Sequence, residues 1–338
     1  MARNLIVVGA GASSDFGFPL GLGLAANIRD RLESELRNPN DPRPILDTAM
    51  MSGQPGDYGA AIRDICGGLV ATRSIDRLLD SRSDRPLVTL LGKCSIVAEI
   101  MQRENQSQIG AATGAKWDER QAALVHARDS WLARLFGLLQ EGVAPRDAHR
   151  IFSSIGFVTF NYDRCIEHYL RLAMHHIVNL PFSEAVQIAN QIPIIHVYGS
   201  LGELPDDLGN GGVPFGPEHH YNKVASESIR TFTEGADDGT IEQIRKVVSE
   251  SLNIYFMGFG FDPKNVSLMF PTPLNLGPLF RGSQRVMGTG LGFAGPERDH
   301  FKAAVSPERS MDFDRLFPAI TCSNLVVGDM FRSRILSS

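Results

Sequence analysis

The sequence has few cysteines, no long apolar run and no excess of positive charge, and each of these absences excludes a class of protein. Its four cysteines lie far apart in a chain of 338 residues and form no C-x-x-C pair. They are Cys66, Cys94, Cys165 and Cys322. This spacing argues against a zinc site and against a dense disulfide framework, and it fits a reducing cytoplasm.

Charge and hydropathy set further limits. The chain carries 33 Lys and Arg against 38 Asp and Glu, so no basic field would attract nucleic acid directly. Lys93 and Glu99 interrupt the most apolar stretch, 87–101, and the apolar run at the N-terminus is too short for a signal peptide. We therefore expect a cytoplasmic protein without a membrane span, folded as one or two domains.

The N-terminus predicts a strand, a tight turn and a helix. Residues 4–8 are apolar and β-rich, and leucine or isoleucine then recurs every fourth residue from Leu20 to Leu36. Gly9 and Gly11 match the first two glycines of the dinucleotide-binding pattern G-x-G-x-x-G, but Ser14 replaces the third. Such glycines let a phosphate approach the backbone.

The segment after this helix does not favour a hydride-transfer enzyme. A dehydrogenase should continue with a second strand and an acidic residue about twenty residues after the glycines, where it holds the ribose. Residues 37–50 are instead polar and broken by prolines. Residues 41–150 then show helical spacing of apolar residues, which indicates an inserted helical module.

β-like runs return after residue 150, with helical stretches at 165–176 and 240–252 between them. The runs are 155–160, 192–198, 252–259, 285–290 and 320–327. We predict an α/β Rossmann-like fold, a mainly parallel sheet with helices on both faces. Its domain comprises 1–40 and 151–338, with 41–150 inserted, and the long segment 202–220 is a candidate lid.

Polar residues follow four of these runs, where a parallel α/β sheet binds its ligands. They are Gly9 to Ser13, then Asn161 and Asp163, then His196 with Tyr198, Gly199 and Ser200, and finally Gly258, Gly260 and Asp262. Simpler explanations stay open: Asn161 and Asp163 can cap the following helix, His196 can be a core histidine, and the late glycines can serve turn geometry.

Four motifs together resemble one family. "GAGASSDFGFP", "TFNYDRCIEHYL", "IIHVYGSLG" and "YFMGFGFDP" are similar to the SIR2-like (sirtuin-related) NAD-binding proteins, and most closely to the bacterial SIR2-like effectors of anti-phage defence. The helical segments "SIDRLLDSR", "GKCSIVAEI" and "DSWLARLF" add to this resemblance, which covers nearly the whole chain. Sirtuin deacylases carry a zinc held by two C-x-x-C pairs, which this chain lacks. The effectors lack that zinc and hydrolyse NAD, so the resemblance implies an NAD glycohydrolase that releases nicotinamide and ADP-ribose without a metal.

The resemblance also assigns residues. Asn161 matches the amide needed for cleavage, Asp163 lies by the nicotinamide pocket, and His196 becomes the candidate general base. The expected NAD-binding residues are Gly9, Ala10, Gly11, Ala12, Ser13, Phe16, Tyr198, Gly199, Ser200, Gly258 and Phe259. One departure matters: the family usually has histidine before the glycine of "HGS", and Tyr198 stands there. Either His196 has taken over the general-base role or Tyr198 has altered the chemistry.

The resemblance further implies control by assembly, because unregulated NAD hydrolysis would kill the host. A homo-oligomer, a separate sensor subunit, or both are expected. Relatives work with a HerA-type ATPase, a short Argonaute or a nucleotide-pyrophosphatase-like protein, and the sequence does not choose among them. The main alternative is a catalytically silent subunit that binds NAD or ADP-ribose or acts as a scaffold, and a sirtuin-type deacylase is a lesser one.

Overall fold

The computed structural model describes residues 3–38, 40–72, 74–110, 117–216, 222–231, 234–270, 284–291, 295–305 and 313–328. Within these residues five strands form one all-parallel sheet in the order β3-β2-β1-β4-β5. The strands are β1 (Asn4–Val8), β2 (Ile155–Thr159), β3 (Ile194–His196), β4 (Asn253–Met257) and β5 (Arg285–Gly288). The predicted α/β Rossmann-like fold is confirmed.

The three central strands end level with one another. Val8 pairs with Thr159 on one side and with Met257 on the other, and every residue of β1, β2 and β4 is buried. Strands covered on both faces need nearly continuous apolar residues, which explains why these runs were visible in the sequence. The strand order reverses between β1 and β4, which is where an open α/β sheet binds ligands.

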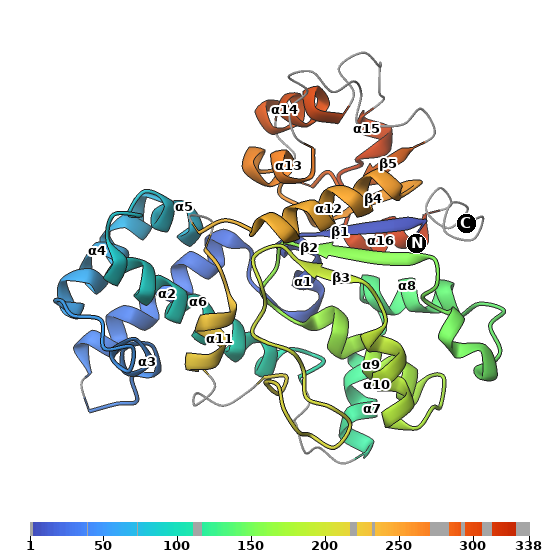
Figure 1. The fold of residues 1–338 in the computed structure, drawn as a ribbon, viewed down its shortest axis with the longest axis horizontal. Helices are drawn as coiled ribbons and strands as arrows, with labels where there is room; N and C mark the ends of the chain where they lie inside the picture. Colours follow the sequence, from blue (N-terminus) through green and yellow to red (C-terminus); the bar gives the residue numbers. More distant parts are fainter. Residues whose placement is uncertain are drawn as a thin grey trace.

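Helices cover both faces of the sheet (Figure 1). On one face lie α8 (Trp131–Gln140), α9 (Cys165–His176) and α10 (Phe182–Asn190), and on the other lie α12 (Asp238–Glu250) and α13 (Pro263–Met269). The other elements of this part of the chain are α1 (Ala10–Ser13), the 3-10 turns Ser14–Phe16 and Pro145–Arg150, α7 (Trp117–His126), α14 (Gly295–Val305) and α15 (Phe313–Leu316).

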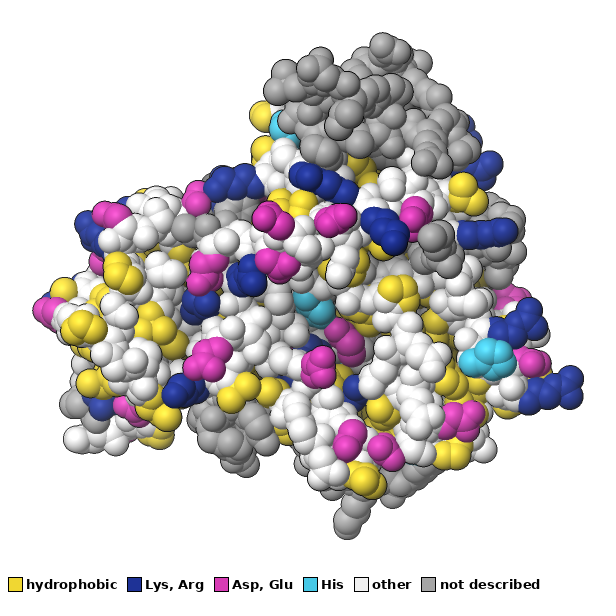
Figure 2. Space-filling view, in the orientation of Figure 1, with side chains coloured by type: hydrophobic (Ala, Val, Ile, Leu, Met, Phe, Trp, Pro, Cys, Tyr) yellow, Lys and Arg dark blue, Asp and Glu magenta, His cyan; other side chains and the backbone are white. Residues whose placement is uncertain are grey.

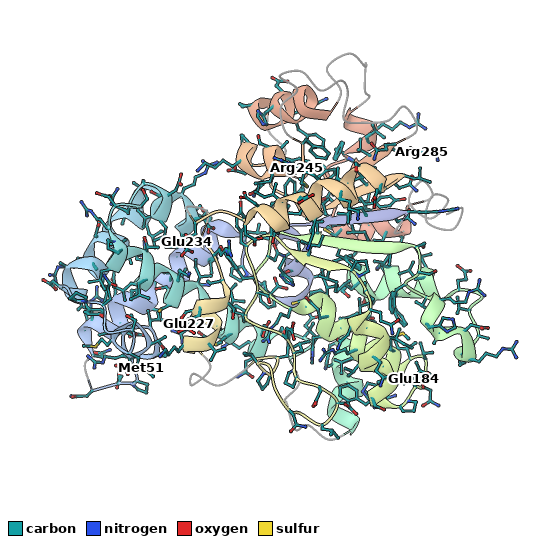
Figure 3. The ribbon with its side chains drawn as sticks, viewed as in Figure 1. Met51, Glu184, Glu227, Glu234, Arg245 and Arg285 are labelled. Atoms are coloured by element: carbon teal, nitrogen blue, oxygen red, sulfur yellow. The ribbon has the colours of Figure 1, made fainter. Side chains whose placement is uncertain are left out.

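A helical lobe projects from one end of the sheet (Figure 1). It contains α2 (Gly21–Arg37), α3 (Pro44–Met50), α4 (Tyr58–Ala71), α5 (Ile75–Asp80), α6 (Pro86–Gln106) and the later α11 (Asn222–Ser228). The first helix, α2, packs on α4 and α6, and α11 packs on α3 and α6. Figure 3 labels Met51 at the far end of the lobe, and Glu234, between lobe and sheet, pairs with Lys93 of α6 at 3.0 Å.

A buried ion pair joins this lobe to the sheet domain. Arg164, just before α9, contacts Glu104 of α6 at 2.5 Å, and both side chains are almost fully buried. Burial raises the pKa of Glu104, while the charge of Arg164 and hydrogen bonds from it and from the Gly216 backbone oppose that rise. Arg164 also donates to the carbonyls of Val213 and Pro214. Residues 213–216 of the candidate lid are therefore hydrogen-bonded to the buried Arg164–Glu104 pair. Residues 217–220 of the lid lie outside the described residues.

One predicted strand is wrong. Residues 320–327 contain the helix α16 (Cys322–Val327), which packs against α8. Thr321 caps it by accepting a hydrogen bond from the Asn324 backbone at 3.3 Å. Its buried residues Cys322, Leu325 and Val326 follow helical spacing, which an apolar run this short does not distinguish from a strand.

The surface carries charges of both signs. On the face drawn in Figure 2, acidic and basic side chains are intermixed. None of the helices in the described parts of the chain combines the length and the apolarity that crossing a bilayer requires.

Candidate functional site

The expected site residues come together at the carboxyl edge of the sheet. Beyond the strands the ladder continues: Gly9 N–H donates to Met257 O at 3.0 Å and Phe160 N–H donates to Val8 O at 2.9 Å. The segments that follow β1, β2 and β4 therefore begin side by side, on both sides of the point where the strand order reverses.

A glycine junction, formed by Gly9, Gly11 and Gly258, closes the gap between the ends of β1 and β4. Gly11 N–H donates to Gly258 O at 2.9 Å. A Cβ on Gly9 would lie 2.7 Å from Gly258 O, and one on Gly258 would lie 2.1 Å from Ala12 N. Gly258 also has a φ of 57°, which favours glycine. Close backbone packing across the sheet thus accounts for these three glycines, whatever else they bind.

Three polar side chains form a buried hydrogen-bond chain that joins the ends of β1 and β2. Asn161 Nδ2 donates to Ser13 Oγ at 2.9 Å, and Ser13 Oγ donates to Asp163 Oδ2 at 2.8 Å. Asn161 Nδ2 also donates to Gly9 O at 3.1 Å. We refer to these three side chains as the Ser13–Asn161–Asp163 network. They are at most 9% exposed, so the network is largely shielded from solvent.

The network determines which way the Asn161 amide points. The single proton of the Ser13 hydroxyl is donated to Asp163 Oδ2, so this hydroxyl must itself accept from Asn161. The Gly9 carbonyl is likewise an acceptor. Both neighbours therefore require the amide nitrogen, and Oδ1 is the remaining polar atom. Among the described residues no donor reaches this oxygen.

The capping interpretation holds for Asp163 in part. Its Oδ1 accepts from Cys165 N–H at 3.2 Å, at the start of α9, while Oδ2 serves the network. Asn161 makes no such cap; its backbone N–H donates to Thr159 Oγ1 at 3.1 Å.

His196 lies beside Asn161 but meets its backbone rather than its amide. Nδ1 is 3.0 Å from Asn161 O, and Nε2 is 2.6 Å from Glu167 Oε1 on α9. Burial lowers the pKa of His196, but the charge of Glu167 and the two hydrogen bonds outweigh it, so the pKa is raised overall. The same pairing lowers the pKa of Glu167 against its own burial. Because a carbonyl and a carboxylate both accept, both ring nitrogens are placed to donate, and the raised pKa favours the protonated ring, which has no lone pair for a general base.

The hydroxyl of Tyr198 is also engaged in a hydrogen bond. Its hydroxyl donates to Asn265 Oδ1 at 2.6 Å, and burial, together with the charges of Asp76 and Asp262, raises its pKa. The ring also borders a cavity of about 390 Å³ beside α13. A neutral phenol held in this way is a hydrogen-bonding group and not a base at neutral pH.

The remaining expected residues have mixed surroundings. Gly199 has a φ of 73° and pairs with Ile229 in an isolated bridge, and Ser200 Oγ accepts from Gly202 N–H at 3.3 Å. Ala10 is exposed at the start of α1. By contrast Ala12, Phe16 and Phe259 are buried.

Three residues of this region were missed by sequence reasoning. Trp131 Nε1 donates to Ala12 O at 2.9 Å, Glu167 holds His196, and Asp76 of α5 reaches Tyr162. Only Glu167 had a sequence signal, because it lies one helical turn after Asp163 at the start of a predicted helix.

In the ranges that the structure describes, no three His, Cys, Asp or Glu side chains are grouped as metal ligands.

No family model matches the sequence, and no curated protein matches it either.

Proposed function

We propose that this protein is a SIR2-like NAD+ glycohydrolase, which cleaves NAD+ to nicotinamide and ADP-ribose. The observation that carries the proposal is the Ser13–Asn161–Asp163 network at the ends of β1 and β2, next to the point where the order of this all-parallel sheet reverses. This is where a dinucleotide binds in such sheets, and the network offers an oriented amide oxygen and a carboxylate there.

The reaction needs these two groups more than it needs a strong base. The bond between nicotinamide and C1′ of the ribose breaks, nicotinamide leaves with the electron pair, and positive charge develops on the sugar, as in glycoside hydrolysis. Water then adds to C1′ and gives its proton to solvent. Asn161 Oδ1 orients a ribose hydroxyl or the water, and Asp163, fixed by Ser13 and Cys165, stabilises the charge.

The phosphates would lie against the glycine junction, with Ala10 exposed beside it. His196 and Glu167 then act as a charged pair that supports the Asn161 backbone. This assignment replaces the general-base role first expected for His196.

A second candidate is a catalytically silent subunit that binds NAD or ADP-ribose or acts as a scaffold. The engaged hydroxyl of Tyr198 and the two engaged ring nitrogens of His196 favour it, because neither side chain can accept a proton as placed. Deacylation remains a lesser alternative, which would require an acylated peptide to accelerate nicotinamide release.

The biological role follows from the resemblance alone. An effector subunit of bacterial anti-phage defence would deplete NAD when triggered, and it would depend on self-assembly or on a separate sensor protein. A HerA-type ATPase, a short Argonaute and a nucleotide-pyrophosphatase-like protein are the partners to test.

The deciding experiment incubates the purified chain with NAD+, alone and with each such partner, and follows nicotinamide by chromatography. Asn161→Ala should reduce turnover by about 10²-fold or more, as removal of one stabilising polar group does in other sites. Asn324→Ala, at an exposed asparagine, is the matched control. Equal turnover by wild type and Asn161→Ala would refute the proposal. Calorimetric binding of ADP-ribose without product under any condition would establish the silent subunit.

A further inference from the structure

The helical lobe contributes one carboxyl group to the carboxyl edge of the sheet. Asp76, in the first turn of α5, has Oδ1 3.2 Å from the hydroxyl of Tyr162, the residue directly after Asn161. Two ion pairs hold α5 against the segment that follows β4. They are Arg77–Asp262 at 3.1 Å and Lys264–Asp80 at 2.7 Å.

Asp76 has no cation of its own within the described residues. The nearby Arg77 and Lys264 are paired with other carboxylates, and the side chain of Arg230 pairs with Asp237 at 3.7 Å. A positive charge placed beside Asp76 would therefore be its first cationic partner and would favour its ionised form.

Tyr162 compensates Asp76 only in part. Its hydroxyl has one proton and faces two acceptors, Asp76 Oδ1 at 3.2 Å and Arg230 O at 3.0 Å. Burial raises the pKa of Asp76, and the Tyr162 hydroxyl opposes this while the charge of Asp262 adds to it. Asp76 nevertheless remains partly exposed, so a ligand at the sheet edge can approach it.

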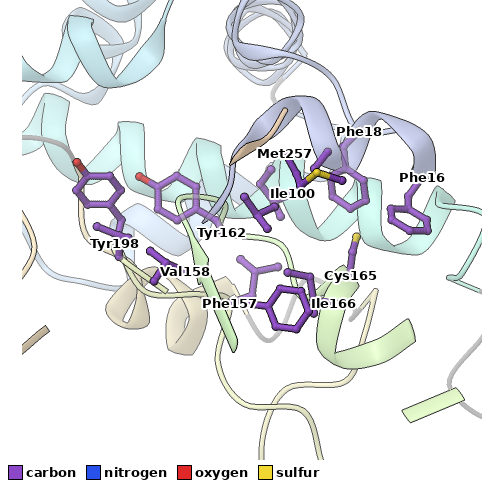
Figure 4. Close-up of a cluster of buried hydrophobic side chains, with 14 of the residues drawn as sticks. Phe16, Phe18, Ile100, Phe157, Val158, Tyr162, Cys165, Ile166, Tyr198 and Met257 are labelled. Atoms are coloured by element: carbon purple, nitrogen blue, oxygen red, sulfur yellow. The ribbon is translucent and has the colours of Figure 1, made fainter. Parts of the chain in front are cut away.

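Two tyrosines lie near this carboxyl group: the Tyr162 hydroxyl is 3.2 Å from it, and its charge contributes to the raised pKa of Tyr198. In Figure 4 the rings of Tyr162 and Tyr198 lie next to each other and their hydroxyl groups point to the same side. Tyr198 also packs edge-on against Phe160, with ring centroids 6.1 Å apart. Both tyrosine rings are buried, so their hydroxyl groups and the carboxyl group without a cation, not the ring faces, are what a cation can meet here.

We infer that Asp76 binds the positively charged nicotinamide ring of NAD+, so that the site selects the oxidised dinucleotide over the reduced one. The inference rests on the proposed function, which puts the nicotinamide ribose at Asn161. The ring attached to that ribose then lies toward the adjacent Tyr162 and Asp76. The helical lobe thereby completes the substrate site.

The test measures binding by calorimetry with three probes. Carba-NAD+, in which a cyclopentane replaces the nicotinamide ribose, keeps the cationic ring and cannot be hydrolysed. NADH has a neutral ring, and ADP-ribose has none. Wild type should bind carba-NAD+ about tenfold or more tighter than NADH, as expected for one charge pair near the surface.

Asp76→Asn should abolish most of that preference and leave the affinity for ADP-ribose unchanged. Asp80→Asn removes an acid from the same helix and should keep the preference, because Asp80 is paired with Lys264. A preference retained in Asp76→Asn would overturn the inference. Absence of the preference from wild type would also overturn it, and that result does not depend on whether the variant folds. Preference without hydrolysis would refute the glycohydrolase and leave the inference standing, while failure of all three probes to bind would refute both.

Discussion

Gly258→Ala tests the glycine junction directly. An added Cβ would lie 2.1 Å from Ala12 N and 2.3 Å from the carbonyl carbon of Gly11, well inside van der Waals contact. Both neighbours are backbone atoms, so no side-chain rotation can relieve the clash. The left-handed φ of 57° adds a second penalty.

The magnitude follows from these two effects. The left-handed conformation costs alanine about 1–2 kcal/mol and overpacking adds about 1–3 kcal/mol, so Gly258→Ala should lower the free energy of unfolding by about 2–5 kcal/mol.

Gly260→Ala is the matched control, because it lies two residues further along the same segment. A Cβ at Gly260 meets no described atom within 4 Å, and this glycine is exposed. Its effect should stay within about 0.5 kcal/mol. Urea unfolding of the wild type and both variants, followed by circular dichroism, gives the comparison. If Gly258→Ala were as stable as Gly260→Ala, the ends of β1 and β4 would not be packed as described, and the placement of phosphates at this junction would lose its basis.

A partly buried ion pair, His196–Glu167, and a buried one, Arg164–Glu104, give the remaining predictions. In Glu167→Gln the pKa of His196 should fall, because a neutral amide no longer stabilises the imidazolium, and an NMR titration of the ring nitrogens would detect it; an unchanged pKa would contradict the pairing. Since the pKa of His196 is raised by folding, its stabilisation is complete below the ordinary value of 6.5 and is lost as the pH rises through the folded value. The stability difference between wild type and Glu167→Gln should therefore shrink in that alkaline range, as measured by urea unfolding at a series of pH values. Arg164→Met should destabilise the fold by about 3–5 kcal/mol, because Glu104 would remain buried without its partner. Adding Glu104→Leu should recover part of this loss in the same unfolding assay, and no recovery would argue against an uncompensated charge.

The strands and their edge could be predicted from local sequence. Runs such as 4–8 and 155–159 are buried on both faces, and that burial requires the continuous apolar residues by which they were recognised. The polar residues that follow the runs then had to share one edge, because the strands are parallel. The same reasoning predicted a strand at 320–327, which is wrong. These apolar residues form a helix that buries one face against α8.

The chemistry of the edge could not be obtained in this way. The orientation of the Asn161 amide depends on Ser13, 148 residues earlier, and the protonation of His196 depends on Glu167, 29 residues earlier. Asp76 meets Tyr162 across 86 residues. Local composition specifies which backbone conformation a segment prefers, whereas hydrogen-bond partners and charge neighbours are set by sheet order and helix packing, which bring distant segments within about 3 Å of one another. The sequence therefore contained the residues of the candidate site, and the packing of the folded chain determined their hydrogen-bond partners and the charges beside them.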